Sequence, residues 1–506
     1  MKSIIKSKIF YLLILLMSVS AILYVLNLKE LYWFEGDIAR DTLKALQILR
    51  NRQITMIGPP LSFGQYGTRE IYFGSLVYYF GVIGLWLFGE NALGPVYVQS
   101  ALMVVSIPFF YLLTRYFFRN KKIRILVTLF YALNPITVLH SRFYWNPNFI
   151  IPLAVWFWLL IFKGISSQRN LIYLFGAGIV GGLIINLHYT VALPIGLVVL
   201  YLLIKRRTRE LAIYFLGLFF ALLPLLLFEI KNNFYLIQAF LFNLQKIQNT
   251  TYQPGLHNLN RIFELGSVIP ILIGLRQEFP FDIRYIVLPE SLIMFLGFLS
   301  LGVYSFLLLK SKLSNGKMVP FVVLSSIIAS VLLSKENYSI RYMYAVYPLL
   351  LITLLLVIKN ISDKWKMTTY VFYLITLMSL ISTYKIVTKQ TIITISKYRM
   401  PSIEDLEYAA KIIKNDYNGR SFNITENITG DSRATYLRYF VYRDVSNDKL
   451  RGVEDYGGLE TLYVITPSQK LTEAENRWEF NATYNLKLAK SWDIKEYKLL
   501  RYDVQK

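Results

Sequence analysis

Long apolar segments recur along the first three quarters of the chain and stop near residue 390. Runs of about 17–25 residues match a helix crossing a ~30 Å hydrocarbon core. The pattern predicts an all-α polytopic membrane protein with about eleven transmembrane helices and additional interfacial helices. The predicted spans are 9–27, 95–117, 123–139, 149–163, 171–187, 190–204, 211–229, 290–309, 318–334, 342–358 and 367–386.

The pattern changes after Gln390, where charged residues become common. A helical stretch at 403–415 and a strand-like stretch at Leu462–Ile465 predict a small C-terminal α/β domain. We therefore expect a transmembrane domain at 1–389 and an extracytoplasmic domain at 390–506.

Basic residues gather in alternate loops between the apolar runs. The net charge of +23 would suggest nucleic-acid binding in a soluble protein, but here the membrane interpretation is favoured, with no nucleic-acid partner. Basic loops mark the cytoplasmic side, so we expect a plasma-membrane protein with a cytoplasmic N-terminus. The longest outside loops are then about 27–94 and 230–289. The basic clusters are Lys2/Lys6/Lys8, Arg119/Lys121/Lys122/Arg124, Lys163/Arg169, Lys205/Arg206/Arg207/Arg209, Lys310/Lys312/Lys317 and Lys359/Lys364/Lys366.

The segment 72–88 is apolar enough to span, but a span there would move the cluster around Lys121 to the outside. Its Tyr, Trp and Gly residues suit an interface. We prefer a re-entrant, interfacial or half-spanning element and keep a full span as the alternative.

The chain has no cysteine and three histidines. The absence of cysteine excludes disulfides, thiol catalysis and Cys-ligated metal. The histidines are scattered, so no metal site is predicted. No cofactor is indicated, and a divalent metal stays open.

Acidic and basic residues follow the first predicted span, in the sequence FEGDIARD. Helical spacing of apolar residues from Ile38 onward predicts an amphipathic helix on the outer surface. Asp37 could be its N-cap or a carboxylate that accepts a proton from a hydroxyl group. Arg40 could bind phosphate, and Asp41 and Glu35 are candidate secondary acids.

Three other predicted outside segments carry arginine and aromatic residues. Arg69 and Arg341 are candidate phosphate ligands, with interfacial anchoring or snorkelling as the alternatives. The remaining candidates could line a substrate site or belong to an aromatic belt. These substrate-lining candidates are Arg142, Tyr144, Trp145, Asn146, His188 and Tyr342. We expect acid, arginine and aromatic groups from these loops to lie at one outer face.

The first span followed by FEGDIARD, together with SRFYWNPNFIIPL and RYMYAVYPLL, resembles the GT-C superfamily of membrane glycosyltransferases. The similar branch includes protein O-mannosyltransferases and lipid A aminoarabinose transferases. The resemblance implies that Asp37 is the catalytic aspartate that begins the family's acidic motif and that Arg40 contacts the donor phosphate. Ile38 stands where the family has a second acid, and Arg69 is the nearest replacement for an altered Lys/His-Pro-Pro-Leu motif.

This resemblance implies an inverting glycosyltransferase. It would move a sugar from a polyprenyl-phosphate donor to a hydroxyl of a lipid, glycan or protein on the non-cytoplasmic face. The alternatives are a transporter or flippase of lipid-linked sugars and a non-catalytic scaffold. A transporter places ionisable residues near mid-bilayer, whereas these predicted spans are nearly free of charge.

Overall fold

The computed structural model divides the chain into two compact units. We call them the helical unit, within 1–26, 54–80 and 96–392, and the α/β unit, within 27–53, 81–95 and 393–506. The described residues are 8–61, 69–166, 171–249, 264–277, 282–284, 286–311, 318–333, 340–363, 366–389, 400–429, 433–445, 449–469, 478–483 and 485–505.

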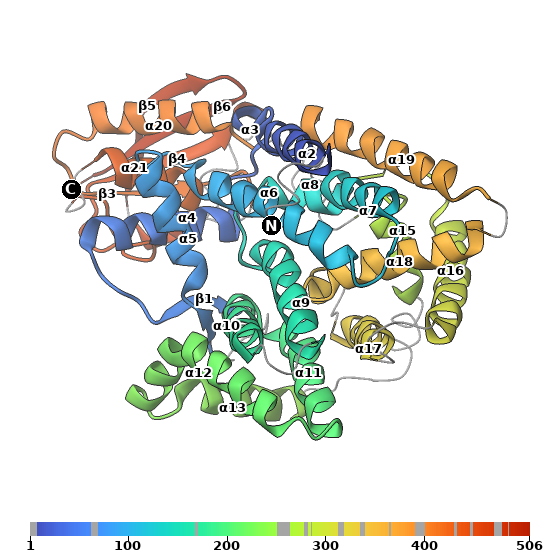
Figure 1. The fold of residues 1–506 in the computed structure, drawn as a ribbon. Helices are drawn as coiled ribbons and strands as arrows, with labels where there is room; N and C mark the ends of the chain where they lie inside the picture. The colour runs from blue at the N-terminus through green and yellow to red at the C-terminus, as the bar shows by residue number, and fades with distance from the viewer. Residues whose placement is uncertain are drawn as a thin grey trace. The chain divides into compact units, whose positions relative to one another are not determined.

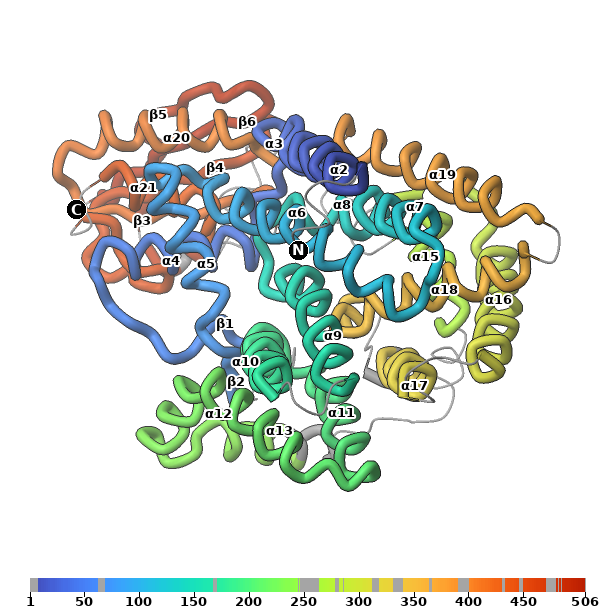
Figure 2. Tube along the Cα trace, viewed as in Figure 1, coloured from blue at the N-terminus to red at the C-terminus, as the bar shows by residue number. Residues whose placement is uncertain are grey.

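The helical unit holds most of the helices, which Figure 2 follows along the chain. Helix α10 packs against both α9 and α12 (Figure 1). Strands β1 (Ile57–Leu61) and β2 (Ile71–Gly74) form a two-stranded antiparallel sheet. The helices are α2 (Lys8–Val25), α6 (Gly94–Thr114), α7 (Lys121–Leu133), α8 (Pro135–Ser141), η1 (Asn146–Phe149), α9 (Ile150–Ser166), α10 (Leu171–Leu187), η2 (Tyr189–Val191), α11 (Ala192–Ile204), α12 (Thr208–Lys231), α13 (Tyr235–Asn249), η3 (Leu265–Ser267), α15 (Val268–Leu272), α16 (Glu290–Lys310), α17 (Met318–Leu333), η4 (Ile340–Met343), α18 (Tyr347–Ser362) and α19 (Thr368–Thr388).

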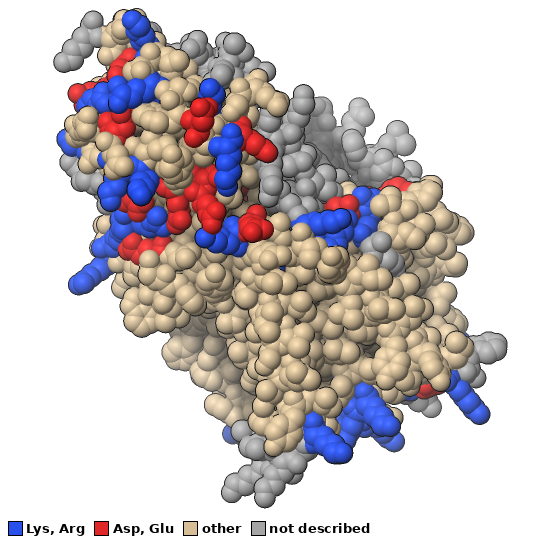
Figure 3. Space-filling model, turned by 90° about the horizontal axis from the view of Figure 1, so that it is seen from above, with Lys and Arg blue, Asp and Glu red and all other residues tan. Residues whose placement is uncertain are grey.

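Each predicted span contains a helix in the structure. The protein is a multi-pass membrane protein. Among the described residues, six helices are long and apolar enough to cross a bilayer, or seven if the bent pair α7–α8 is one span. The other four predicted spans are shorter apolar helices. The count of eleven transmembrane helices therefore stays a prediction. Figure 3 shows a broad surface without charged side chains, with Lys and Arg gathered at its margins.

The segment 72–88 forms β2 and the 12-residue helix α5 (Leu76–Leu87). Twelve helical residues extend about 18 Å, which is shorter than a ~30 Å hydrocarbon core. Other predicted spans are also shorter apolar helices, so the non-spanning interpretation of 72–88 stays a prediction. Residues of α5 are divided between the two units.

The bend between α7 and α8 lies at Asn134–Pro135, where the two helix axes differ by 47°. Proline cannot continue the hydrogen-bond ladder of α7, but it suits the first turn of α8. The Asn134 side chain accepts from the Ile136 N–H and donates to the Leu272 carbonyl, while Tyr347 donates to it at 2.8 Å. The break is thus stabilised by partners from distant segments.

The α/β unit contains a four-stranded sheet of order β3–β4–β6–β5. The β3–β4 pair is parallel, and the other two pairs are antiparallel. Ser402 and Asp405 form a capping box that begins α20. The elements are α3 (Leu28–Leu31), α4 (Gly36–Asn51), α20 (Ile403–Asp416), β3 (Phe422–Glu426), α21 (Thr435–Asp444), β4 (Thr461–Pro467), α22 (Trp478–Ala482), β5 (Leu486–Ile494) and β6 (Tyr497–Val504).

Two segments from the N-terminal part of the chain belong to the α/β unit, namely 27–53 and 81–95. The predicted domain at 390–506 contains neither of them. The amphipathic helix α4 is therefore grouped with the sheet and its helices.

Candidate active site

The first cluster of candidate residues lies at the start of α4. This helix begins at Gly36, which has φ +51°, and its N-cap is Glu35. Asp37 lies in the first turn, so the alternative that Asp37 is the N-cap is wrong. Its side chain is 54% exposed, and the positive end of the helix dipole favours its carboxylate.

Arg40 joins two acids in this cluster. Its Nη1 lies 2.7 Å from Asp37 Oδ1, and its Nε donates to Asp41 Oδ1 at 2.8 Å. Because Arg40 is one turn from Asp37 and next to Asp41, the helix itself sets this geometry. The guanidinium holds one exposed and one buried carboxylate together.

Asp41 differs from Asp37 in its environment. Its side chain is 1% exposed, and Oδ2 has no hydrogen-bond partner among the residues that the structure describes. Burial raises the pKa of Asp41 to about 7, although the charge of Arg40 lowers it. Asp41 can therefore exchange a proton near neutral pH, whereas the exposed Asp37 is the acid open to solvent.

The remaining candidate acid, Glu35, accepts a hydrogen bond from the Trp33 indole at 2.8 Å. The neighbouring Phe34 is buried and packs edge-to-face on Tyr439 and Phe440 of α21. The segment before α4 is thus anchored by aromatic contacts inside the α/β unit.

The apolar face of α4 packs on protein, whereas a helix lying on the membrane would turn that face to lipid, so the position of α4 at the outer surface stays a prediction. Ile38, Leu43 and Leu46 are buried, and α4 packs against α21. An amphipathic pattern is the same for a helix on lipid and a helix on a protein core, so the sequence did not separate them.

Arg50, near the end of α4, fixes this packing. Its guanidinium pairs with the Glu90 carboxylate at 2.5 Å and donates to the carbonyls of Tyr442 and Arg443 at 3.0 and 2.9 Å. Tyr439 donates to the Glu90 carbonyl at 2.8 Å. The Arg50 network joins the end of α21 to α4, because a cation stabilises the last carbonyls of a helix.

The second cluster lies in the helical unit and centres on Arg341 in η4. The guanidinium lies 5.6 Å from the Trp145 ring centroid and 5.1 Å from that of Tyr342, and Nη2 donates to the Tyr342 hydroxyl at 3.2 Å. Both distances fit cation–π contacts. Arg341, Trp145 and Tyr342 are all half-buried. We call these residues, with His188, the Arg341 cluster.

His188 completes this cluster. Its ring stacks on Phe73 with centroids 5.0 Å apart and meets Tyr342 edge-on at 6.3 Å. Burial lowers the pKa of His188 to about 3, and the charge of Arg341 acts in the same direction. His188 is therefore neutral near pH 7. The sequence had singled out His188 but not Phe73, because an aromatic residue among many carries no local signal of its partner.

Three other candidates have structural partners. Arg142 is 6% exposed and donates to the carbonyls of Leu23, Tyr24 and Leu26 at the end of α2. Tyr144 donates to the Val77 carbonyl at 2.6 Å. Asn146 donates to the Leu187 carbonyl at 2.7 Å, at the end of α10. These contacts hold loops and helix ends in place.

Arg69 is exposed, and its guanidinium lies 4.6 Å from the Phe242 ring centroid. Its backbone exchanges two hydrogen bonds with the side chain of Asn243. This arrangement anchors Arg69 to α13 and leaves its phosphate role a prediction. Within the described part of the chain, no group of three or more His, Asp and Glu residues could hold a metal ion.

Comparison with known proteins finds a matching family model and several solved structures with a similar fold. Residues 75–228 match the family model described as Dolichyl-phosphate-mannose-protein mannosyltransferase. No curated protein sequence matches the chain. The resemblance to GT-C glycosyltransferases is confirmed by this match and by the solved structures that follow.

Solved structures similar to the chain include three membrane glycosyltransferases. ArnT from Cupriavidus metallidurans bound to undecaprenyl phosphate is 10% identical, with TM-score 0.56 and 96% and 97% of the two chains covered. An oligosaccharyltransferase from Archaeoglobus fulgidus is 13% identical, with TM-score 0.52 and coverage of 96% and 73%. The arabinofuranosyltransferase AftD from Mycobacteria is 13% identical, with TM-score 0.52, and the match covers 98% of this chain and 40% of AftD.

We predict that Arg50→Ala loosens α4 from α21. Losing charged hydrogen bonds of about 1.5–3 kcal/mol should speed amide exchange across α4 by about 10- to 100-fold. Hydrogen exchange of the purified protein, read by mass spectrometry, measures this. Lys44→Ala, an exposed change on the same helix, should leave exchange unaltered. Equal protection in both variants would contradict the anchoring role of Arg50.

Proposed function

We propose that the protein is an inverting glycosyltransferase that uses a polyprenyl-phosphate sugar donor and an acceptor hydroxyl. The observation that carries this proposal is the Asp37–Arg40–Asp41 cluster at the start of α4, in a chain with the fold of ArnT and AftD. ArnT is described as bound to undecaprenyl phosphate, which supports a lipid-linked donor here. The acceptor is a hydroxyl of a lipid, a glycan or a protein.

Asp37 is proposed as the general base. Its exposed carboxylate can receive the acceptor proton as the acceptor oxygen bonds to the anomeric carbon. The bond between that carbon and the phosphate oxygen breaks in the same displacement, so the configuration inverts. The electron pair leaves with the polyprenyl phosphate, which gains negative charge.

Arginine side chains are proposed to stabilise that charge. Arg341 presents a half-buried guanidinium between aromatic rings, where less water competes for a phosphate. Arg40 and Arg69 are the other proposed phosphate ligands. Trp145, Tyr342 and His188 supply flat or neutral surfaces that suit a sugar ring. Arg142, Tyr144 and Asn146 stay proposed substrate-lining residues, and their hydrogen bonds to backbone carbonyls would hold them in place.

Asp41 is proposed to position Arg40 from its buried side. A buried carboxylate with a pKa of about 7 is also a suitable proton acceptor, so it is the alternative base. Accessibility favours Asp37, because the acceptor must reach the base. Glu35 is the other candidate secondary acid.

Asp37→Asn should slow sugar transfer by about 10²–10⁴-fold, because the amide cannot accept the proton. The purified protein would be incubated with polyprenyl-phosphate sugars, and the polyprenyl phosphate released would be measured. Release also separates this function from transport of a lipid-linked sugar, which leaves the glycosyl bond intact. Donor binding should survive, since arginines make the phosphate contacts.

Asp41→Asn is the matched control for this test. If Asp41 were the base, Asp41→Asn would abolish transfer while Asp37→Asn kept it. The wild-type rate would then rise with pH below about 7 and level off above it, because only the ionised carboxylate accepts a proton. This combination would transfer the catalytic role to Asp41.

Arg341→Ala should lower kcat/KM by about 10- to 100-fold, since a hydrogen bond to a charged group contributes about 1.5–3 kcal/mol. Arg341→Lys should recover only part of the activity, because lysine keeps the charge but loses the planar fork. Arg119→Ala, in a predicted cytoplasmic loop, should have wild-type kinetics. Unchanged kinetics in Arg341→Ala would remove Arg341 from donor binding.

The reaction is proposed to occur on the non-cytoplasmic side of the plasma membrane. The basic loops support this orientation, with Asp37, Arg341 and the C-terminal domain opposite Lys122 and Arg206. Single cysteines at these positions of the cysteine-free chain, labelled with an impermeant thiol reagent, test it. Labelling of positions 122 and 341 from the same side would refute the topology.

A further inference from the structure

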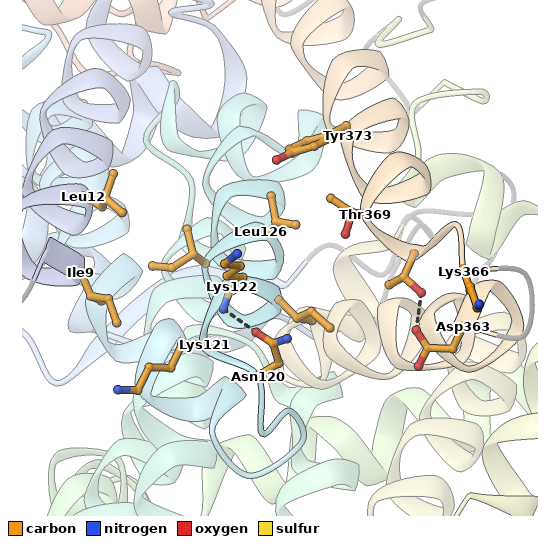
Figure 4. Close-up of a pocket in the computed structure, with 13 residues that line it drawn as sticks. Ile9, Leu12, Asn120, Lys121, Lys122, Leu126, Asp363, Lys366, Thr369 and Tyr373 are labelled. Carbon is orange, nitrogen blue, oxygen red and sulfur yellow. Dashed lines mark hydrogen bonds between the residues drawn. The ribbon is translucent and has the colours of Figure 1, made fainter.

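A cavity of about 550 Å³ lies in the helical unit among the ends of α2, α7 and α19 (Figure 4). Its volume falls in the range of small-molecule and lipid-headgroup sites. None of its lining residues belongs to the proposed catalytic clusters. They are Ile9, Leu12, Asn120, Lys121, Lys122, Ile123, Ile125, Leu126, Asp363, Lys366, Thr368, Thr369 and Tyr373.

Three lysines line the cavity, with Lys122 between Lys121 and Lys366 (Figure 4). Lys121, Lys122 and Lys366 are exposed, and the described residues include no carboxylate in an ion pair with them. The one lining carboxylate, Asp363, already pairs with Lys359 and accepts from the Thr368 hydroxyl. The lysine charges therefore exceed the acidic charge, and the cavity favours an anion.

Two helix N-termini add to this preference. Helix α7 begins at Lys121, and α19 begins at Thr368, so both first turns line the cavity. The N-terminal end of each helix carries partial positive charge and unpaired N–H groups. Asn120 caps one of these groups, accepting from the Lys122 N–H at 2.8 Å. The lysines and the helix ends thus both favour an anion in this cavity.

Apolar side chains also line the cavity. Ile9 and Leu12 of α2 face it from one side and Leu126 of α7 from another, with Tyr373 of α19 beside Thr369 (Figure 4). Helices α2 and α19 are both candidate membrane spans, and α7 belongs to the bent pair. A free phosphate would leave this apolar wall exposed, whereas the acyl chains of a lipid would cover it.

We infer that this cavity binds an anionic glycerophospholipid, with its phosphate at Lys122, between Lys121 and Lys366, and its chains along Ile9, Leu12 and Leu126. The lysines come from loops predicted to be cytoplasmic, where anionic lipids meet basic pockets between helices. This inference is independent of the proposed glycosyl transfer, because it uses none of the catalytic residues.

Native mass spectrometry of the purified full-length protein, mixed with equal amounts of phosphatidylglycerol and phosphatidylcholine, tests the inference. The wild type should retain phosphatidylglycerol in preference. The triple change Lys121→Gln, Lys122→Gln and Lys366→Gln should reduce that retention at least about tenfold, as expected when several charge contacts are lost. The matched control removes equal charge from another loop predicted to be cytoplasmic. It combines Lys205→Gln, Arg206→Gln and Arg209→Gln and should bind as the wild type does.

A second pair of variants tests the apolar wall. Thr369→Trp fills the cavity and should displace the lipid, while Tyr370→Trp, at an exposed neighbour outside the lining, should not. Size-exclusion profiles confirm that the variants are folded. No lipid preference in the wild type, or equal loss in the two triple variants, would overturn the inference. Displacement by glycerol 3-phosphate at the lipid's own concentration would show a phosphate site and also overturn it.

Discussion

Hydrocarbon offers no hydrogen bonds, so a polar group buried in the helical unit must find its partners within the chain. Arg142 meets this constraint by donating to three carbonyls at the end of α2, and Asn134 meets it through Leu272 and Tyr347. These contacts set where the first helix ends and where α7 breaks. The same constraint keeps ionisable chemistry out of the spans and confines it to their ends.

The α/β unit applies a second constraint to the proposed catalytic helix. Arg50 binds Glu90 and the last carbonyls of α21, and Phe34 packs on Tyr439 and Phe440. Helix α4 is thereby held at both ends. Because positioning errors of about 1 Å can cost 10²-fold in rate, a rigid support for Asp37 has functional value. This assigns the C-terminal part of the chain a role in holding the helix that carries the proposed base.

The arginines that looked alike in the sequence differ in what surrounds them. Arg142 is enclosed by carbonyls, Arg50 joins a carboxylate to a helix end, and Arg341 lies between aromatic rings. Carbonyls and carboxylates compete with a phosphate for a guanidinium, whereas an aromatic face carries no full negative charge. The described partners of Arg341 are thus aromatic and those of Arg142 are backbone carbonyls, and the roles of both arginines in substrate binding stay proposals.

Local sequence determined much of this protein. Apolar runs predicted the helices, because helix length and hydropathy are properties of contiguous residues. FEGDIARD placed Asp37, Arg40 and Asp41 on one helix, since that geometry is set by residues three and four apart. The sequence could not show that α4 packs on α21, that Arg50 meets residues almost 400 positions away, or that Asp41 is buried while Asp37 is not. Those features depend on contacts between segments distant in the chain, and only the tertiary structure decides burial and partners of that kind.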